Sequence, residues 1–342
     1  MNKKRLIIFG IGLAMTFLIV SYLRRDSPGL HHIQGQTMGT IIYNVKYVDS
    51  EINGLDQMIA QKLVDFNQSL STYIPDSEIS RLNKQGTLTY ESNFFLPVLE
   101  ASQEVYENTN GTFDPSIGPL VQAWGFGPDK RIPNLDSTKV DSLKSVIGFG
   151  KVRFDREKVS LPPKFQLDFS AIAKGYAVDA VAELLESKDI DNYMVEIGGE
   201  VRCRGKNDQE KPWALGIEDP TVASNEQELM AIVRLKDLSL ATSGNYRNYY
   251  EKEGKIYAHI IDPRTGYTAK HNLLSASVFA ENCMMADAYA TAFMVLGLDY
   301  SKEILKAQNL DAILIYRSEN GIESFVSEGI RPFLEMNKAG GN

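Results

Sequence analysis

Two periodicities of apolar residues run along this chain and predict a mixture of strands and helices. Alternation of apolar and polar residues over 41–48 predicts a strand, whereas apolar residues three and four positions apart over 51–66 predict a helix. The same criteria predict helices over 93–108, 171–186 and 283–296 and strands over 161–169, 193–202, 213–217, 231–235, 255–261, 275–280 and 312–316. Because no strict strand–helix–strand rhythm is present, the predicted fold class is α+β with mixed or antiparallel sheets.

The N-terminal 25 residues have a separate pattern, an apolar run between two basic clusters. Lys3-Lys4-Arg5 precede the run over 6–23, and Arg24-Arg25 follow it. As a helix this run would be roughly 27 Å long, close to the thickness of a bilayer core. No small-x-small cleavage site follows it, and no cysteine lies nearby for lipid attachment. We therefore predict a single-pass transmembrane anchor over 1–25, with a cleaved signal peptide as the alternative.

The rest of the chain is expected to form one continuous, acidic domain. We predict a polar linker over 26–34, a single domain over 35–335 and a disordered tail over 336–342. The chain has 36 Lys+Arg against 44 Asp+Glu, and since five of the cations lie in the anchor, the remainder carries about −13. A body this acidic repels polyphosphate backbones, so nucleic acid is not the expected partner.

The chain has two cysteines, Cys203 and Cys283. They are too few for a disulfide framework or a cysteine-built metal site. We expect both to be small buried hydrophobic residues, with a single disulfide as the alternative.

Residues 168–175, Asp-Phe-Ser-Ala-Ile-Ala-Lys-Gly, lie at a predicted junction between a strand and a helix. We expect the strand to end at Asp168, Ser170 to cap the helix and Lys174 to lie in its first turn. The helix dipole disfavours a cation there, and an anionic ligand would offset that cost, because free N–H groups at helix N-termini bind phosphates. The alternative is a lysine that extends into solvent.

The segment 283–296 is apolar nearly all round and predicts a buried helix. Asp287 and Thr291 are four residues apart, so their oxygens share one face. A lone buried carboxylate is costly unless it is paired or bound to a metal, and these hard oxygens suit Mg²⁺ completed by phosphate. In the alternative, Asp287 serves the helix N-terminus and Thr291 bonds back to a carbonyl.

His259 is one of four histidines and lies on a predicted strand just before a turn signature, Asp262-Pro-Arg-Thr-Gly266. An imidazole at this place could deprotonate a hydroxyl nucleophile. A structural histidine is the alternative.

Three glycine-bearing segments suit a flat aromatic ligand. The segment 123–127, Ala-Trp-Gly-Phe-Gly, offers aromatic faces, and 242–246, Thr-Ser-Gly-Asn-Tyr, is a polar loop. Gly198-Gly199 inside a predicted strand indicates a bulge or a close backbone approach. Ordinary core packing and turns are the alternative for each. The sequence lacks GxGxxG, Walker, GxSxG and HExxH motifs.

Taken together, these segments resemble the ApbE family of FAD:protein FMN transferases, in the family's order from about Gly35 to Gly297. Each match alone is weak, but the whole set in register is specific. The matching segments are 35–40, 71–73 with 76–83, 113–115, 123–125, 168–175 with Asp179, 196–199, 241–244, 259–266 and 286–291.

The resemblance implies a single ApbE-like catalytic domain related to the T-fold and a Mg²⁺-dependent reaction. The FMN half of FAD, the substrate, would be transferred to a Thr or Ser hydroxyl of an acceptor flavoprotein through a phosphoester bond, with release of AMP. The expected acceptors are flavoprotein subunits of membrane redox complexes such as Rnf and the sodium-pumping NADH:quinone reductase. With the anchor, this implies an inner (cytoplasmic) membrane protein whose catalytic domain lies on the periplasmic side.

The resemblance also implies roles for particular residues. His259 would activate the acceptor hydroxyl, and Mg²⁺ would be held by the Ala171 carbonyl and by oxygens of Asp287 and Thr291. The flavin-site positions are Met38, Tyr73, Ala123, Trp124, Gly125, Asp168, Lys174 and Ile261. Some relatives carry a second aspartate where this chain has Ala290, which leaves the coordination number and affinity of the metal open.

Two other functions are weighed against transfer. One is Mg²⁺-dependent hydrolysis of FAD to FMN and AMP, which in the family accompanies an asparagine where this chain has Tyr73. The other is a tethered flavin-binding protein without chemistry, which the presence of both His259 and Asp287 disfavours.

Overall fold

The computed structural model describes residues 29–127, 135–220, 228–244, 249–252, 255–258 and 260–336. The predicted anchor over 1–25, the catalytic candidate His259 and residues 337–342 of the predicted tail lie outside this part of the chain. Among the described residues, no helix is both long and apolar enough to cross a membrane.

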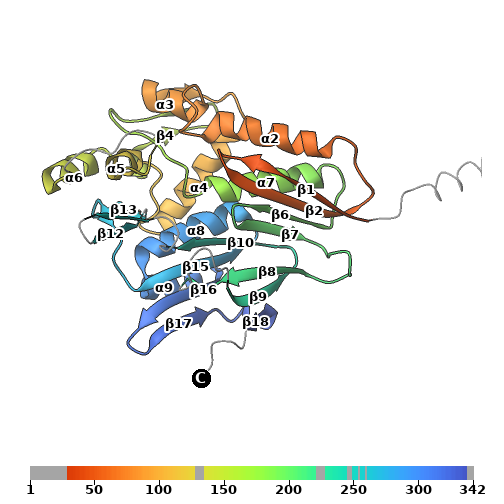
Figure 1. Ribbon diagram of the computed structural model, residues 1–342. Helices are drawn as coiled ribbons and strands as arrows, with labels where there is room; N and C mark the ends of the chain where they lie inside the picture. The colour runs from red at the N-terminus through yellow and green to blue at the C-terminus, as the bar shows by residue number, and fades with distance from the viewer. Residues whose placement is uncertain are drawn as a thin grey trace, which may run out of the picture.

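The centre of the fold is a sheet in which eight strands are described, with the order β1-β2-β6-β7-β10-β15-β16-β17 (Figure 1). Every pair of neighbours is antiparallel, which confirms the predicted α+β class. The strands are β1 (Gly29–Thr37), β2 (Ile41–Asp49), β6 (Tyr193–Ile197), β7 (Glu200–Arg204), β10 (Leu238–Gly244), β15 (Leu273–Ala280), β16 (Asp311–Ser318) and β17 (Gly321–Val326).

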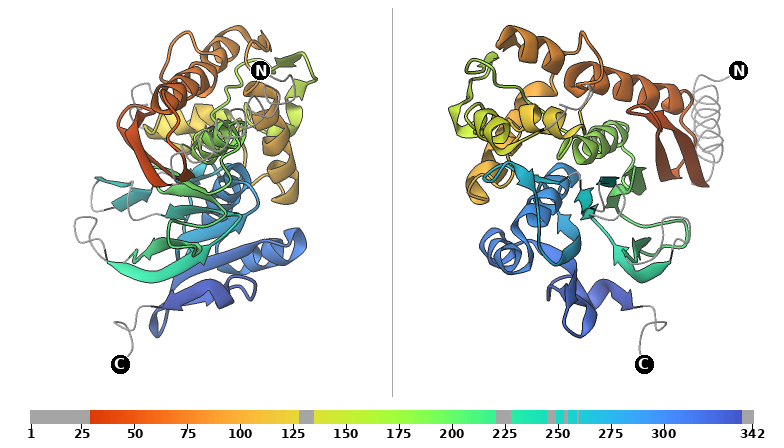
Figure 2. Two further views of the ribbon diagram at one scale, coloured as in Figure 1. Left: turned by 90° about the vertical axis from the view of Figure 1, so that its right-hand side faces the viewer. Right: turned by 60° about the vertical axis from the view of Figure 1, so that its left-hand side comes forward.

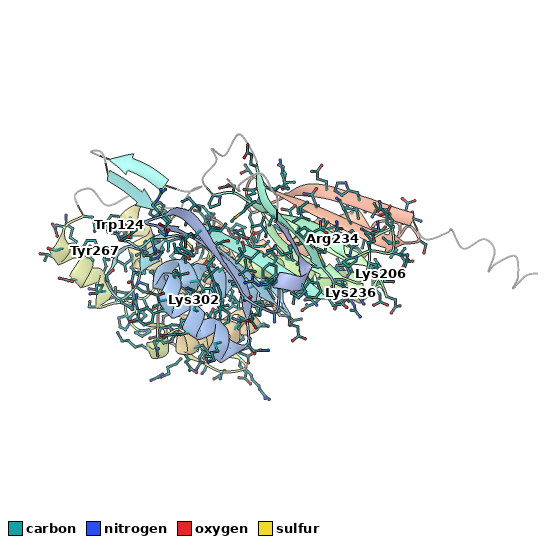
Figure 3. The ribbon with its side chains drawn as sticks, turned by 90° about the horizontal axis from the view of Figure 1, so that it is seen from below. Trp124, Lys206, Arg234, Lys236, Tyr267 and Lys302 are labelled. Atoms are coloured by element: carbon teal, nitrogen blue, oxygen red, sulfur yellow. The ribbon has the colours of Figure 1, made fainter. Side chains whose placement is uncertain are left out.

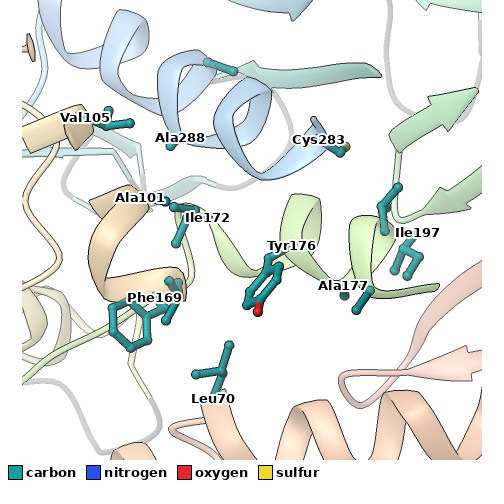
Figure 4. Packing of buried hydrophobic residues seen from close by; sticks show 14 of the residues in the cluster. Leu70, Ala101, Val105, Phe169, Ile172, Tyr176, Ala177, Ile197, Cys283 and Ala288 are labelled. Atoms are coloured by element: carbon teal, nitrogen blue, oxygen red, sulfur yellow. The ribbon is translucent and has the colours of Figure 1, made fainter. Parts of the chain in front are cut away.

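Helices α7 (Ala173–Glu186) and α8 (Cys283–Leu296) cover one face of this sheet. Figure 4 shows how they pack together, with Tyr176 and Ala177 of α7 and Cys283 and Ala288 of α8 in the shared core. Helices α2 (Leu55–Leu70) and α4 (Phe95–Asn108) pack next to this pair. Residues of α7 and α8 are apolar on several sides because the pair lies between the sheet and this outer layer.

A second core lies on the opposite face of the sheet, under a three-stranded sheet of β8 (Trp213–Glu218), β9 (Leu229–Leu235) and β18 (Leu334–Met336). In Figure 2 the aquamarine β9 and the blue helices α8 and α9 (Leu298–Gln308) lie on opposite sides of the central sheet. The domain thus has a helix layer, a central sheet and a smaller sheet.

Smaller elements complete the described part of the chain. They are α3 (Glu78–Gln85), α5 (Gly118–Trp124), α6 (Ser137–Lys144), η1 (Phe149–Lys151), η2 (Arg331–Phe333), β3 (Thr87–Thr89), β4 (Arg153–Phe154), β5 (Lys158–Ser160), β11 (Tyr249–Lys252), β12 (Lys255–Ala258), β13 (Ile261–Asp262) and β14 (Tyr267–Thr268).

Helix boundaries follow local capping signals. Helix α8 spans the predicted residues because the Asn282 side chain accepts a hydrogen bond from Met285 N at 2.9 Å, and Gly297, with φ of 79°, ends the helix. Helix α2 begins only at Leu55, later than predicted, because Gly54 adopts a left-handed conformation just before it. Both cysteines are buried and free, which confirms that expectation.

The strand predicted over 161–169 is absent, and this prediction was wrong. Only Gln166 forms a bridge, to Ile117, while the apolar residues around it are buried by side-chain packing rather than by strand pairing. Asp168 Oδ1 accepts a hydrogen bond from Ser170 N at 2.8 Å and so closes a turn. Ser170 therefore does not cap the helix, which begins at Ala173 without a side-chain cap.

Three other boundaries also differ from expectation. Gly198-Gly199 is the turn of the β6–β7 hairpin and not a bulge, since Ile197 pairs with Glu200 and both glycines have positive φ. The strand predicted over 255–261 is divided between β12 and β13. Strand β1 begins at Gly29, inside the predicted linker, because its residues pair with β2 along their whole length.

Candidate active site

A charged centre lies where the N-terminus of α7 meets α8. Gly175 permits this contact, because a Cβ atom there would lie 2.2 Å from the Cys283 carbonyl oxygen and 2.7 Å from Asp287 Cβ. Asp287 Oδ2 accepts a hydrogen bond from Gly175 N at 2.9 Å. The buried carboxylate therefore lies at the positive end of the α7 dipole.

This contact revises two expectations. Asp287 serves a helix N-terminus, as the structural alternative proposed, but the helix is α7, while Asn282 caps α8. The N–H group of Gly175, expected to be available for a phosphate, is used by a protein carboxylate. A ligand phosphate at this place would therefore need a cation to join it to Asp287.

Lys174 supplies the positive charge of the centre. Its Nζ atom donates a hydrogen bond to Glu200 Oε1, in a salt bridge. Burial alone would lower the pKa of Lys174, but the negative charges of Glu200 and Asp287 outweigh it and raise that pKa, so the ammonium stays charged. The alternative of a lysine that simply extends into solvent is therefore wrong.

Both carboxylates of the centre are held away from water. Burial raises the pKa of Glu200 and of Asp287, and in each case the Lys174 ammonium opposes the shift. Glu200 is 1% exposed, and its Oε2 has no hydrogen-bond partner within the described part of the chain. Glu200 was not predicted as a site residue, although it directly follows the Gly198-Gly199 turn.

Asp179, five residues after Lys174 on α7, fixes α8 against α7. Its carboxylate accepts hydrogen bonds from Cys283 N at 3.0 Å and Met284 N at 2.8 Å, and Arg202 pairs with it at 2.9 Å. Two first-turn N–H groups of α8 are thereby satisfied by a residue of α7. This clamp sets the position of Asp287 relative to Lys174.

The residues at this centre fit a divalent cation with oxygen ligands. Asp287 offers a buried carboxylate, and the Thr291 hydroxyl donates no hydrogen bond to any described residue, so it does not bond back to a carbonyl. Ala171 lies in the turn that leads into α7. No cluster of three or more His, Cys, Asp or Glu side chains suited to a metal is found among the described residues, so backbone, hydroxyl or ligand oxygens would have to complete the shell.

An aromatic cluster lies at the other end of the 168–174 segment. Trp124, 6% exposed, packs with Ile261 and donates from Nε1 to the Gly266 carbonyl oxygen at 2.9 Å. The Tyr267 ring contacts its edge, with 6.0 Å between centroids, and Figure 3 shows the two side chains next to each other. Tyr267 is a member of the cluster that the sequence analysis missed.

Tyr73 joins this cluster to Asp168. Its ring is 67% exposed, and its hydroxyl donates to the Phe126 carbonyl oxygen at 3.4 Å. Partial burial and the negative charge of Asp168 raise the pKa of Tyr73. The exposed Tyr73 ring offers a surface on which a flat ring system can stack.

The other predicted flavin-site residues occupy defined backbone positions. Ala123 is buried in α5, and Gly125 ends that helix with φ of 85°. Met38 lies in the β1–β2 turn with φ of 48° and packs against the main core. Apart from Met38, the predicted site residues within the described part of the chain thus lie in or next to two groups, an aromatic one and a charged one, and residues 168–174 connect the two.

A cavity of about 350 Å³ lies on another side of α8. Its lining includes Glu104, Met285, Tyr289 and Asp311, and none of the predicted site residues. Asp287 is two positions from both Met285 and Tyr289 on the helix and therefore points in a different direction. The cavity is separate from the charged centre.

The charged centre on the helix pair and the aromatic cluster thus lie in one mixed α and β domain built on an antiparallel sheet. The chain belongs to the ApbE family, whose model matches residues 38–314.

Sequence and structure comparisons agree with this assignment. The chain is 40% identical over 318 residues to the FAD:protein FMN transferase of Haemophilus influenzae, covering 89% of this chain and 91% of the relative. It is 32% identical to that of Escherichia coli K12, covering 95% and 97% of the two chains. The flavin transferase ApbE from Vibrio cholerae superposes with a TM-score of 0.80 at 34% identity, covering 90% of this chain and 99% of that one.

Proposed function

We propose that this protein is a FAD:protein FMN transferase that moves the FMN moiety of FAD onto a Thr or Ser hydroxyl of an acceptor flavoprotein. The hydroxyl oxygen forms a bond to the phosphorus on the FMN side, the bond from that phosphorus to the AMP phosphate breaks, and AMP leaves. The hydroxyl proton passes to His259. The observation that carries the proposal is the charged centre of Lys174, Glu200 and Asp287 at one end of a segment whose other end bears an aromatic surface.

Mg²⁺ would be held in this site by Asp287, Thr291 and the Ala171 carbonyl. When bound, it supplies positive charge that neutralises the diphosphate and the leaving AMP. Lys174 adds a second, fixed positive charge, and Trp124 and Tyr73 orient the flavin ring.

We further propose an inner-membrane location, with residues 1–25 as a single-pass anchor and the domain on the periplasmic side. The apolar run between basic clusters supports the anchor, and the resemblance to the family suggests the periplasmic side. Acceptors would then be flavoprotein subunits of membrane redox complexes of the Rnf or sodium-pumping NADH:quinone reductase type. Protease added to intact spheroplasts should digest the domain, and protection of the domain until lysis would contradict this orientation.

Hydrolysis of FAD to FMN and AMP is the second candidate reaction. It needs the same charged centre, with water as the attacking group. Tyr73 argues against it, because in the family this behaviour accompanies an asparagine at that position.

Mass spectrometry of an acceptor protein tests the proposed function. The full-length chain is incubated with FAD, Mg²⁺ and an acceptor domain that carries a target threonine. An acceptor heavier by one FMN, with AMP released, is the expected result. Free FMN and AMP without an adduct would indicate the hydrolase, and intact bound FAD would indicate a binding protein.

A pair of matched variants makes this test specific to the charged centre. Asp287→Asn should lower transfer on the order of a hundredfold or more, since it removes the buried negative charge expected to hold the cation. Asp65→Asn, on the exposed side of α2 and hydrogen-bonded only to Gln61 among described residues, should transfer as the wild type does.

A further inference from the structure

Glu200 has a carboxylate oxygen that the fold leaves without a partner. Its Oε1 accepts from Lys174, whereas Oε2 is buried and has no hydrogen-bond partner among the described residues. Native proteins rarely leave a buried charged oxygen unpaired, because the group loses its hydration without compensation. The unpaired Oε2 atom of Glu200 therefore lowers the stability of the folded state, which indicates that Glu200 has a role other than stability.

The β6–β7 turn also lies close to this carboxylate. A Cβ atom built at Gly198 would lie 3.7 Å from Glu200 Oε2 and 3.7 Å from Lys174 Cδ, so the turn backbone passes next to both side chains. Glu196 fixes the turn, since it accepts hydrogen bonds from Gly199 N at 2.8 Å and from Asn44 Nδ2 at 2.6 Å. Glu200 is thus held against Lys174 by the β6–β7 hairpin.

The charges of the centre do not balance. One ammonium, Lys174, faces two carboxylates, Glu200 and Asp287, while the neighbouring Asp179 is already paired with Arg202. Above the raised pKa of Glu200, about 8, both carboxylates are ionised, and the centre then carries one net negative charge and repels a diphosphate. Adding a divalent cation changes the net charge to one positive, which attracts the diphosphate. The binding measurements are therefore made above that pKa.

We propose that Glu200 is a positioning residue that sets this charge, so that the site binds FAD tightly only together with a divalent cation. The inference rests on the proposed function, since it concerns FAD and metal at the same centre. Glu200 would thereby couple the binding of FAD to the binding of the divalent cation. This coupling is reciprocal, so each ligand strengthens the binding of the other by the same factor.

The test measures binding of each ligand alone and of both together to the full-length chain, without any acceptor. Mn²⁺ serves as the metal probe, followed by electron paramagnetic resonance, and FAD binding is followed by flavin fluorescence. For the wild type we expect FAD affinity to rise at least about tenfold on addition of Mn²⁺.

Glu200→Gln keeps the shape of the side chain and removes one negative charge. It should weaken Mn²⁺ binding roughly tenfold and strengthen metal-free FAD binding several-fold, since the ammonium of Lys174 is then less neutralised. The matched control is Glu210→Gln, an exposed glutamate paired with Lys206 at 3.2 Å, which should bind both ligands as the wild type does.

A double variant separates charge from structure. Lys174→Gln/Glu200→Gln leaves Asp287 as the one charged group of the centre and restores the net charge of the wild type, so Mn²⁺ affinity should return to within about threefold of the wild type. FAD affinity in the presence of Mn²⁺ should fall, because the ammonium is lost. If Glu200→Gln alone does not fold, this double variant decides the question.

Three results would overturn the inference while leaving the proposed function intact. They are a wild type that binds FAD equally with and without metal, a Glu200→Gln variant that loses affinity for both ligands alike, and a double variant that does not recover Mn²⁺ binding. A wild type that binds neither ligand would instead refute the proposed function, and the linkage with it.

Discussion

Trp124 is bound to its surroundings through both parts of its indole, the ring in an apolar cluster and Nε1 on the Gly266 carbonyl. Trp124→Phe should keep most of the packing but lose the hydrogen bond, lowering the free energy of unfolding by about 1–3 kcal/mol through the buried, unpaired carbonyl. It should also weaken FAD binding, since the ring surface shrinks. Urea unfolding and flavin fluorescence measure the two effects.

The second tryptophan provides the control for this prediction. Trp213 donates from Nε1 to the Arg204 carbonyl at 3.0 Å in the core on the other face of the sheet. Trp213→Phe should lower stability by a similar amount and leave FAD affinity unchanged. Equal loss of FAD affinity in both variants would mean that Trp124 acts on the flavin only through stability.

His271 should make the free energy of unfolding depend on pH, and the sign of this dependence follows from its hydrogen bonds and burial. Nδ1 accepts a hydrogen bond from Leu273 N at 3.2 Å and Nε2 lies 2.7 Å from the Met294 carbonyl oxygen, so the neutral ring satisfies both contacts. Burial lowers the pKa of His271 below 6.5. The unfolded chain therefore binds more protons below that pH, and this contribution to stability is lost as the pH falls through the lowered pKa.

The prediction compares the wild type with His271→Gln, in which this titration is absent. The difference in free energy of unfolding between the two should shrink as the pH is lowered from about 7.5 to about 5.5. Urea titrations at several pH values provide the measurement. A difference that stays constant with pH would show that the imidazole does not titrate between those limits.

Single residues also show where sequence reasoning reaches its limit. Burial of Cys203 and Cys283 was predictable from composition. The role of Lys174 was predictable in part, because its place in the first turn of a helix depends on neighbours in sequence. Glu200 was not, because its partner Lys174 lies 26 positions away and only the fold brings them together.

At the scale of elements, the close contact between α7 and α8 depends on the glycine at position 175, which has no side chain. Gly175→Ala would place a Cβ atom within 2.2 Å of the Cys283 carbonyl oxygen, and both helix backbones would have to shift. We expect a loss of about 1–3 kcal/mol in the free energy of unfolding, typical of overpacking. Mn²⁺ affinity should also fall, since Asp287 moves away from Gly175 N. Unchanged melting temperature and affinity would contradict this account of the contact.

Elements were predictable where their signals are local. Helix α8 has its cap at Asn282 and its stop at Gly297, and both can be recognised without knowing the fold. Residues 165–169 alternate apolar and polar side chains as a strand does, but the segment pairs only at Gln166, and pairing partners are a property of the whole sheet. The order that places β10 between β7 and β15 was not predictable for the same reason.

The whole molecule should respond to its ligands as a single unit. FAD and Mg²⁺ that bind only the folded state at about a hundred times their dissociation constants should add about 2.7 kcal/mol to the free energy of unfolding. Differential scanning fluorimetry should show a rise in melting temperature that EDTA reduces. For Asp287→Asn, EDTA should make no difference, and a persisting EDTA effect would place the metal elsewhere.

The hydrogen bond between Asp287 and Gly175 joins residues 112 positions apart. Ribosomes add about 5–20 residues per second, so roughly 6–22 s separate the synthesis of these two positions. During that interval the N-terminus of α7 is already made, while the helix that carries its carboxylate partner does not yet exist. A chain stopped before Cys283 would contain Tyr73, Trp124 and Lys174 but not the second helix of the pair. The active site of this fold can therefore form only after the ribosome has synthesised nearly the whole chain.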